Sequence, residues 1–331
     1  MKNSSGYILF ILIALCGKTW AQDFHLSLPD AAPMYINPAL TGQFDGKYRA
    51  HLQYRTQWNS LNIRPFTTAL ASFDMPVKSF AFGIQVMNNN AGTGYYNSLG
   101  ILGSAAYRFS IDEPGFHNFA AAVQFGGLQK SVKEEELYFE NQYNPLNGGY
   151  FDNNIPSAEN LNAQNFWIPD VIVGFSYFYG KTAAKINPFI GYSVNHLNKP
   201  KESFYQTANT LPYRHIIHGG VKYNLNERFQ FFGKGIMMKQ VNNTQFNATL
   251  LAYYTIKDPG LILFAGPSFR NKDSFIFEIG GRFSAYQLRL SYDFNTSSLK
   301  TYTNGRGGFE IAFTYIPKLQ KPNPIKSCPR L

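Results

Sequence analysis

The sequence predicts an all-β protein, a transmembrane antiparallel β-barrel of about 14 strands with an extended N-terminal segment and a short C-terminal tail. Three observations lead to this fold class. The composition is rich in aromatic residues and poor in charge, strand-like runs alternate polar and apolar side chains, and long connections occur only at every second position along the chain. Aromatic residues make up 17% of the 331 residues and charged residues 15%, whereas about a quarter is charged in ordinary soluble domains.

Residues 1–21 have the features of a secretory signal peptide. Lys2 precedes the apolar run 7–15, and small residues near Ala21 predict cleavage after it. We therefore expect an exported protein whose domains are the signal peptide, a periplasmic N-terminal segment over 22–47, the barrel and a periplasmic tail.

The two cysteines limit the covalent chemistry. A lipoprotein signal through Cys16 fits less well, because Leu15 stands where that signal needs a small residue. Loss of Cys16 with the signal leaves only Cys328, so no internal disulfide is expected.

Beyond the signal no run of about 18 apolar residues predicts a transmembrane helix. An exported chain without such a helix can be integral to a membrane if its strands close into a barrel.

The net charge of +10 bears on the choice of partners. Nucleic acid fits poorly, because the chain is exported and its basic residues are not clustered. Acidic lipid headgroups and lipopolysaccharide of the outer membrane fit better, and plain solubilising charge is the simplest explanation of the excess.

Residues 22–47 precede the first strand. Pro29, Pro33 and Pro38 exclude a continuous helix or a central strand in this region. An ordered or extended lead-in segment on the periplasmic side is expected.

The first strand-like run is YRAHLQYRTQW at 48–58. At a period of two, Leu52 and Tyr54 point one way, while Arg49 and Arg55 point the other. The edge strand of a soluble sandwich would alternate in the same way. In a barrel, however, the aromatic face meets lipid and the two arginines face the lumen.

Clusters of turn residues divide the rest of the chain into similar runs. The boundaries fall near 48–58, 66–74, 79–88, 97–109, 117–129, 168–179, 186–197, 213–224, 228–238, 244–256, 261–270, 274–283, 285–294 and 308–316. The late runs alternate most clearly, and the first and last are expected to pair and close the barrel. The run from 228 is noisier, because Phe232, Ile236 and Met238 share the face that carries Lys234.

Connection length follows a parity rule. Counted from the first strand, the long connections, among them 130–167, 198–212 and 295–307, are all odd-numbered, and the even-numbered ones are all short. Outer-membrane barrels have short periplasmic turns and longer extracellular loops. We therefore expect the barrel over 48–316, the tail over 317–331, and both ends of the mature chain on the short-turn side.

Charged residues at inward positions of the runs are candidates for the lumen. They are Arg49, Arg55, Lys222, Lys234, Glu278, Arg282, Arg289, Asp293 and Glu310. As a basic stripe with carboxylates opposite, they would form an anion-selective lumen or a peptide site. The simpler interpretation is an internal charge network that plugs and stiffens the barrel.

Motifs for catalysis and metal binding do not occur. The sequence has no H-E-x-x-H spacing, Walker loop, nucleophile elbow or dinucleotide fingerprint, so no enzyme activity, metal or cofactor is expected. The acidic run Glu134, Glu135 and Glu136 lacks the spacing of a calcium loop and is better explained as a solvated surface.

Aromatic residues near the strand ends suit a girdle at the outer interface. They are Trp58, Tyr95, Tyr96, Trp167, Tyr205 and Tyr213.

Short motifs in a fixed order carry a family resemblance. They are APMYINPALTG at 32–42, YRTQW at 54–58, SYDFNTS at 291–297, GGFEIAFTY at 307–315 and CPR at 328–330. Together they resemble the PorP/SprF family of outer-membrane proteins of the type IX secretion system in Bacteroidetes. One departure is Leu331, which follows CPR where many members have an aromatic residue.

The resemblance implies a barrel without enzymatic activity that assists the export or surface anchoring of cargo such as large adhesins. It also implies periplasmic secretion-system partners and a link to gliding motility. The short-turn side would face the periplasmic partners, and the long loop 130–167 would meet cargo. The partner-binding candidates are Pro33, Asn37, Pro38, Gly42, Glu134, Glu135, Glu136, Trp167, Cys328, Pro329 and Arg330. The alternative function is a diffusion channel for small solutes, and a barrel enzyme such as a lipase is a third.

Overall fold

The computed structural model describes most of the chain. The described residues are 23–61, 64–92, 94–113, 115–145, 148–152, 154–157, 164–181, 183–204, 209–258 and 260–318. The predicted signal peptide, Tyr205 and the candidates Cys328, Pro329 and Arg330 lie outside them. Among the described residues, no helix is long and apolar enough to cross a membrane.

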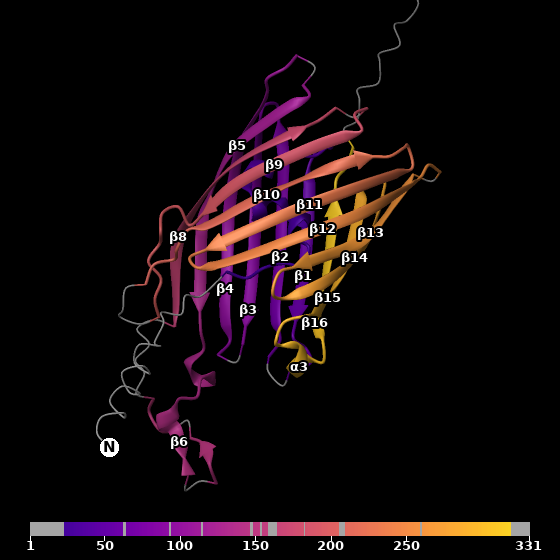
Figure 1. Ribbon diagram of the computed structural model, residues 1–331. Helices are drawn as coiled ribbons and strands as arrows, with labels where there is room; N and C mark the ends of the chain where they lie inside the picture. Colours follow the sequence, from indigo (N-terminus) through magenta and orange to yellow (C-terminus); the bar gives the residue numbers. More distant parts are fainter. Residues whose placement is uncertain are drawn as a thin grey trace, which may run out of the picture.

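Fourteen antiparallel strands in the described chain close into one barrel, which confirms the predicted fold class (Figure 1). They are β1 (Arg49–Gln57), β2 (Phe66–Val77), β3 (Phe80–Ala91), β4 (Tyr96–Ser110), β5 (His117–Ser131), β8 (Asn165–Tyr179), β9 (Ile186–Asn195), β10 (Arg214–Asn224), β11 (Phe229–Gln240), β12 (Asn243–Ile256), β13 (Leu261–Arg270), β14 (Ser274–Phe283), β15 (Tyr286–Asn295) and β16 (Arg306–Tyr315). The first strand pairs with the last, with Leu52 opposite Phe313 and Arg55 opposite Glu310. This pairing closes the ring.

The two faces of the wall differ as the alternation predicts. Leu52, Phe125 and Phe175 point outward and are 58%, 62% and 61% exposed. Their neighbours along the strands, such as Gln53 and Gln124, are buried inside. An apolar outer belt with a polar interior is the arrangement that a barrel needs in lipid.

The connections separate the two ends of the barrel. The long β5–β8 connection contains η3 (Glu134–Glu136), η4 (Glu140–Gln142) and the small hairpin of β6 (Tyr143–Asn144) and β7 (Tyr150–Phe151). It projects beyond the end of the barrel where α3 (Lys300–Thr303) also lies (Figure 1). We call this the long-loop end, and the opposite end, where the even-numbered connections turn, the short-turn end.

Residues 23–42 lie inside the barrel, and we call them the lumen segment. They form η1 (Pro29–Ala31), α2 (Pro33–Ile36) and η2 (Pro38–Leu40). Each of these short helices begins with proline, whose missing N–H is not needed at a first helical position. The expectation of a periplasmic segment over 22–47 is therefore wrong for the lumen segment, which packs inside the barrel. The prolines do exclude a long helix, but the compact turns that they start fit within the lumen.

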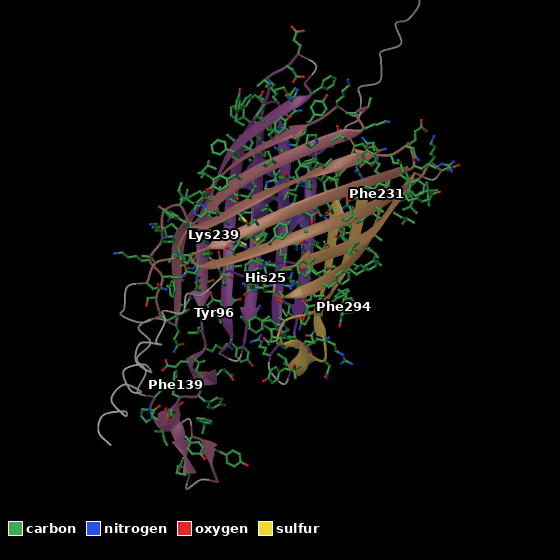
Figure 2. All side chains as sticks on the ribbon, viewed as in Figure 1. His25, Tyr96, Phe139, Phe231, Lys239 and Phe294 are labelled. Atoms are coloured by element: carbon green, nitrogen blue, oxygen red, sulfur yellow. The ribbon has the colours of Figure 1, made fainter. Side chains whose placement is uncertain are left out.

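The lumen segment runs from the long-loop end to the short-turn end. The backbone N–H of Asp23 donates to Gln240, the last residue of β11, at 3.2 Å, and its carboxylate reaches His196, which follows β9. At the other end the N–H of Gly42 donates to Asp74 of β2 at 2.7 Å. The described chain thus starts at the long-loop end, which corrects the expectation that both ends lie on the short-turn side. Figure 2 shows His25 within the barrel.

Apolar side chains of the lumen segment pack against apolar inward positions of the strands. Leu26 and Tyr35 belong to one buried cluster with Ile236 and Met238 of β11. This contact explains the noisy alternation of the run 228–239. The inward side chains Ile236 and Met238 are apolar because they pack against the lumen segment and not against water.

Two inward glycines make room for the turn at Asn37. A Cβ atom on Gly174 would lie 2.0 Å from the Asn37 Oδ1 atom, and one on Gly191 would lie 2.9 Å from its Nδ2 atom. The Asn37 amide donates to the carbonyls of Phe175 at 2.9 Å and Tyr192 at 3.3 Å. The amide of the fully buried Asn37 therefore replaces side chains on β8 and β9.

Candidate functional site

The lumen segment is bound to the last strands by a buried ion-pair cluster. Asp293 accepts hydrogen bonds from Arg55 at 2.9 Å, Arg270 at 2.7 Å and the Ser27 hydroxyl at 2.7 Å. Glu310 accepts the Ser27 backbone N–H at 2.6 Å, and its Oε2 atom lies 3.3 Å from the Arg55 Nε atom. These charges are nearly inaccessible to water. Removing one member would leave the others buried and uncompensated.

Asp30 forms a second cluster further along the segment. Its Oδ2 atom lies 2.5 Å from Lys234 Nζ and 3.0 Å from Arg289 Nη1. Arg289 also donates through Nε to Glu278 at 2.8 Å. Two cations and two carboxylates thus meet between the lumen segment, β11, β14 and β15.

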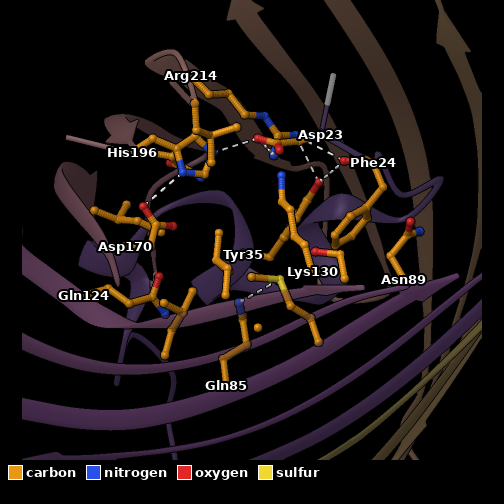
Figure 3. Close-up of a pocket in the computed structure, with 18 of the residues that line it drawn as sticks. Asp23, Phe24, Tyr35, Gln85, Asn89, Gln124, Lys130, Asp170, His196 and Arg214 are labelled. Atoms are coloured by element: carbon orange, nitrogen blue, oxygen red, sulfur yellow. Dashed lines mark hydrogen bonds and ion pairs between the residues drawn. The ribbon is translucent and has the colours of Figure 1, made fainter. Parts of the chain in front are cut away.

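Asp23 and His196 anchor the segment at the long-loop end (Figure 3). His196 Nε2 lies 2.8 Å from Asp23, and Nδ1 lies 2.9 Å from Asp170. Burial opposes protonation of this imidazole, but the charge of Asp23 and the hydrogen bonds to both carboxylates raise the pKa of His196 to about 9. Arg214 Nη1 lies 3.6 Å from Asp23. A cavity of about 80 Å³ adjoins this cluster.

Gly42 ends the lumen segment at another buried carboxylate, Asp74 of β2. Asp74 accepts two hydrogen bonds from Arg49, at 2.9 and 2.6 Å, as well as the Gly42 N–H. Gly42 has a φ of +69°, and a Cβ atom there would lie 2.4 Å from the Ala81 Cβ atom. Only glycine fits this turn without strain.

The structure places the predicted lumen residues on the inner face of the barrel. Arg49, Arg55, Lys234, Glu278, Arg289, Asp293 and Glu310 are buried there, and Lys222 and Arg282 are half-buried in a hollow. The carboxylates pair with the cations as in the simpler interpretation, an internal charge network, and do not stand opposite a basic stripe. They alternate with the cations along the same wall, as Arg55 and Glu310 show by facing each other in register.

Several of the predicted partner-binding residues are not accessible. Asn37, Pro38 and Gly42 are buried in the lumen and Pro33 is half-buried. The expectation that these residues meet periplasmic partners is therefore corrected, because their contacts are with the barrel wall.

The remaining described candidates lie at the long-loop end. Glu134, Glu135 and Glu136 form η3 in the β5–β8 connection. Trp167 lies in β8 and not in the loop, with its side chain on the outer face and 54% exposed. It therefore suits the aromatic girdle better than a contact with cargo.

Sequence reasoning missed the acidic residues of the lumen segment itself, Asp23 and Asp30. A signal for a segment inside the barrel was present, because inward apolar positions such as Ile216 and Ile236 need an apolar neighbour there.

Among the described residues, no group of His, Cys, Asp and Glu is arranged to hold a metal ion.

A closed antiparallel barrel with an apolar outer belt and an ion-paired interior defines an outer-membrane β-barrel protein. The family model described as "Type IX secretion system membrane protein PorP/SprF" matches residues 21–315. The chain belongs to this family, and it is accordingly an outer-membrane component of type IX secretion.

Solved structures show the same architecture at low identity. The "TodX deltaS2S3 mutant monoaromatic hydrocarbon channel" aligns with a TM-score of 0.51 and 12% identity, covering 92% of this chain and 97% of that one. The "TodX monoaromatic hydrocarbon channel deltaS2 mutant" gives 0.51 and 11%, covering 86% and 93%. At this identity the likeness concerns the fold alone. A search of curated proteins finds no match.

Proposed function

We propose that this chain is a non-enzymatic anchoring partner of type IX cargo, which holds an exported protein such as a large adhesin at the cell surface. The observation that carries the proposal is the occupied lumen. Ion pairs of Asp23 and Asp30, and hydrogen bonds from Ser27 to Asp293 and Glu310, hold the lumen segment along the length of the barrel. A lumen filled in this way suits a scaffold better than a conduit.

The projecting β5–β8 connection is the proposed contact with cargo. In the described part of this connection four large aromatic side chains are close to half exposed or more, which is unusual for a loop in water. They are Tyr138 (55%), Tyr143 (49%), Tyr150 (73%) and Phe151 (48%). Phe139 lies in the same projection, away from the barrel (Figure 2). Exposed tyrosines are common anchors of protein interfaces.

The tail is proposed to meet the periplasmic side of the secretion system. Tyr315 ends β16 at the short-turn end, and the chain continues to CPR at 328–330. Parity of loop length assigns that end to the periplasm.

Co-purification tests the loop. Serine substitution of Tyr138, Tyr150 and Phe151 together is expected to reduce recovery of the surface adhesin at least about tenfold. The matched control is Tyr302→Ser, because Tyr302 is 75% exposed at the same end of the barrel but belongs to the β15–β16 connection. Equal recovery with both variants would reject the loop as the cargo contact.

The alternative function is a diffusion channel, which the hollows at the short-turn end favour. Conductance in planar bilayers separates the two functions. The anchor predicts no steady current from the full chain, and a steady open current would support the channel.

A further inference from the structure

The lumen segment leaves part of the lumen open next to the short-turn end. Three adjoining hollows of about 340, 210 and 430 Å³ lie there, and Lys222 lines all three. The first also has Phe232, Tyr253, Phe264 and Arg282 in its wall. We call the three hollows together the short-turn vestibule.

Lys222 and Arg282 differ from the other inward-facing cations. Arg49, Arg55, Lys130, Arg214, Lys234, Arg270 and Arg289 each lie within ion-pair distance of a carboxylate. Arg108 is bound by two backbone carbonyls instead. Among the described residues, neither Lys222 nor Arg282 has an ion pair or a side-chain hydrogen bond, although both are half-buried.

The one carboxylate in the lining does not neutralise them. Glu227 lines the largest hollow together with Lys222, but its Oε2 atom lies 2.5 Å from Lys257 Nζ. It is also the more exposed member of that pair, at 81%. The vestibule therefore has an excess of positive charge.

Aromatic rings cover the wall between the two cations. Lys222 is in β10 and Arg282 in β14, and the strands between them supply Phe232, Tyr253 and Phe264. Tyr253 and Phe264 stack with centroids 4.8 Å apart, and Phe232 meets Tyr253 edge to face at 6.5 Å. Such a surface binds flat apolar groups.

The vestibule ends inside the barrel at the Asp30 cluster. The Lys234 Nζ atom lies 5.7 Å from the centre of the Phe232 ring, and the same atom binds Asp30 at 2.5 Å. A solute that enters from the short-turn end therefore meets the lumen segment within a few ångströms of Phe232.

We propose that the short-turn vestibule binds a small aromatic carboxylate. The carboxylate lies between Lys222 and Arg282, where a guanidinium offers paired donors to two oxygens. The aromatic body rests on Phe232, Tyr253 and Phe264. Inorganic anions would use the charge but not the rings, and neutral aromatics would use the rings but leave the two cations unpaired.

Calorimetry on the full chain in lipid nanodiscs tests this site, with 4-phenylbutyrate as the probe. Saturable binding is expected for 4-phenylbutyrate, and binding at least about tenfold weaker for butyrate and for 4-phenyl-1-butanol. Arg282→Met and Lys222→Met should each raise the Kd about tenfold or more. Lys185→Met is the matched control, because Lys185 is exposed in the β8–β9 connection at the same end and lines none of the three hollows; its Kd should not change.

Phe232→Leu separates the rings from the charge. This variant should bind 4-phenylbutyrate more weakly and should bind butyrate as weakly as the unmodified chain does. Heat-modifiable migration in gels verifies that each variant still forms the barrel. The proposal is overturned by an absence of saturable binding, by equal affinity for the neutral alcohol or for butyrate, or by folded Lys222 and Arg282 variants that bind as the unmodified chain does.

Discussion

At the scale of single residues, the lumen depends on carboxylates that each serve several donors. Asp293 is 1% exposed and accepts from Arg55, Arg270 and Ser27. Buried charge of this kind is stable only while it is balanced, so its loss costs more than the contact contributes.

Asp293→Asn should therefore lower the free energy of unfolding by about 3 to 5 kcal/mol, because two buried guanidinium groups lose their shared counter-charge. Urea titration followed by the heat-modifiable gel band measures this. Glu227→Gln makes the same chemical change in an exposed pair and should leave stability nearly unchanged. A similar midpoint for both variants would contradict the ion-pair account.

His196 makes the attachment of the lumen segment depend on pH. Its pKa of about 9 lies above the usual 6.5, because Asp23 and Asp170 outweigh the effect of burial. A group with a raised folded pKa stabilises fully below its unfolded pKa and loses that contribution as pH rises through the folded value. Attachment at Asp23 should be complete near about pH 6 and weaken between about 6.5 and 9.

Hydrogen exchange of residues 23–28 measures this attachment across that range. In the His196→Asn variant, the amides of residues 23–28 should exchange quickly at every pH, because asparagine cannot carry the positive charge of a protonated imidazole. His117→Asn, a change at the other end of the barrel, should keep the normal profile. Protection that stays constant from about pH 6 to about pH 10 in the unmodified chain would rule out the effect.

At the scale of elements, the strands could be predicted, but the contacts of the lumen segment with them could not. Strand β13 occupies 261–270 in both the prediction and the structure, because alternation and turn residues are local signals. The contacts of the lumen segment are remote in sequence: the Ser27 N–H meets Glu310, 283 positions later. No periodicity encodes such a pairing, so the charged lumen residues were identified but their partners Asp23 and Asp30 were not.

The glycines under Asn37 give this element a direct test. Gly174→Ala should displace the Asn37 turn and cost about 1 to 3 kcal/mol, because the added methyl group would overlap the Asn37 Oδ1 atom. Gly233→Ala is the matched control, since no heavy atom lies within 4 Å of its added Cβ. Unfolding midpoints and proteolysis of the lumen segment report the difference. Equal behaviour would show that the turn is not bound as described.

At the scale of the whole molecule, closure through β1 and β16 is the feature on which the others depend. Leu52 and Phe313 face each other across this seam on the outer surface. Directly opposed antiparallel residues have Cα atoms about 4.5 to 5.5 Å apart, within the range of a disulfide.

Leu52→Cys with Phe313→Cys, in a Cys328→Ser background, should therefore crosslink on oxidation and raise the temperature at which the gel band unfolds. The pair Leu52→Cys with Tyr292→Cys is the control, because β15 is one strand further round. Failure of the first pair to crosslink in the folded barrel would contradict the seam.

The position of the lumen segment also sets an order of assembly. Ser27 and Leu28 precede every strand in the chain, yet their N–H groups bind Glu310 in the final one. The binding site for the first-made segment is thus complete only when the last-made strand arrives. Closure of the barrel and docking of the lumen segment must therefore finish together. A chain truncated before β16 would lack both the β1–β16 seam and the Glu310 side chain that binds Ser27 and Leu28.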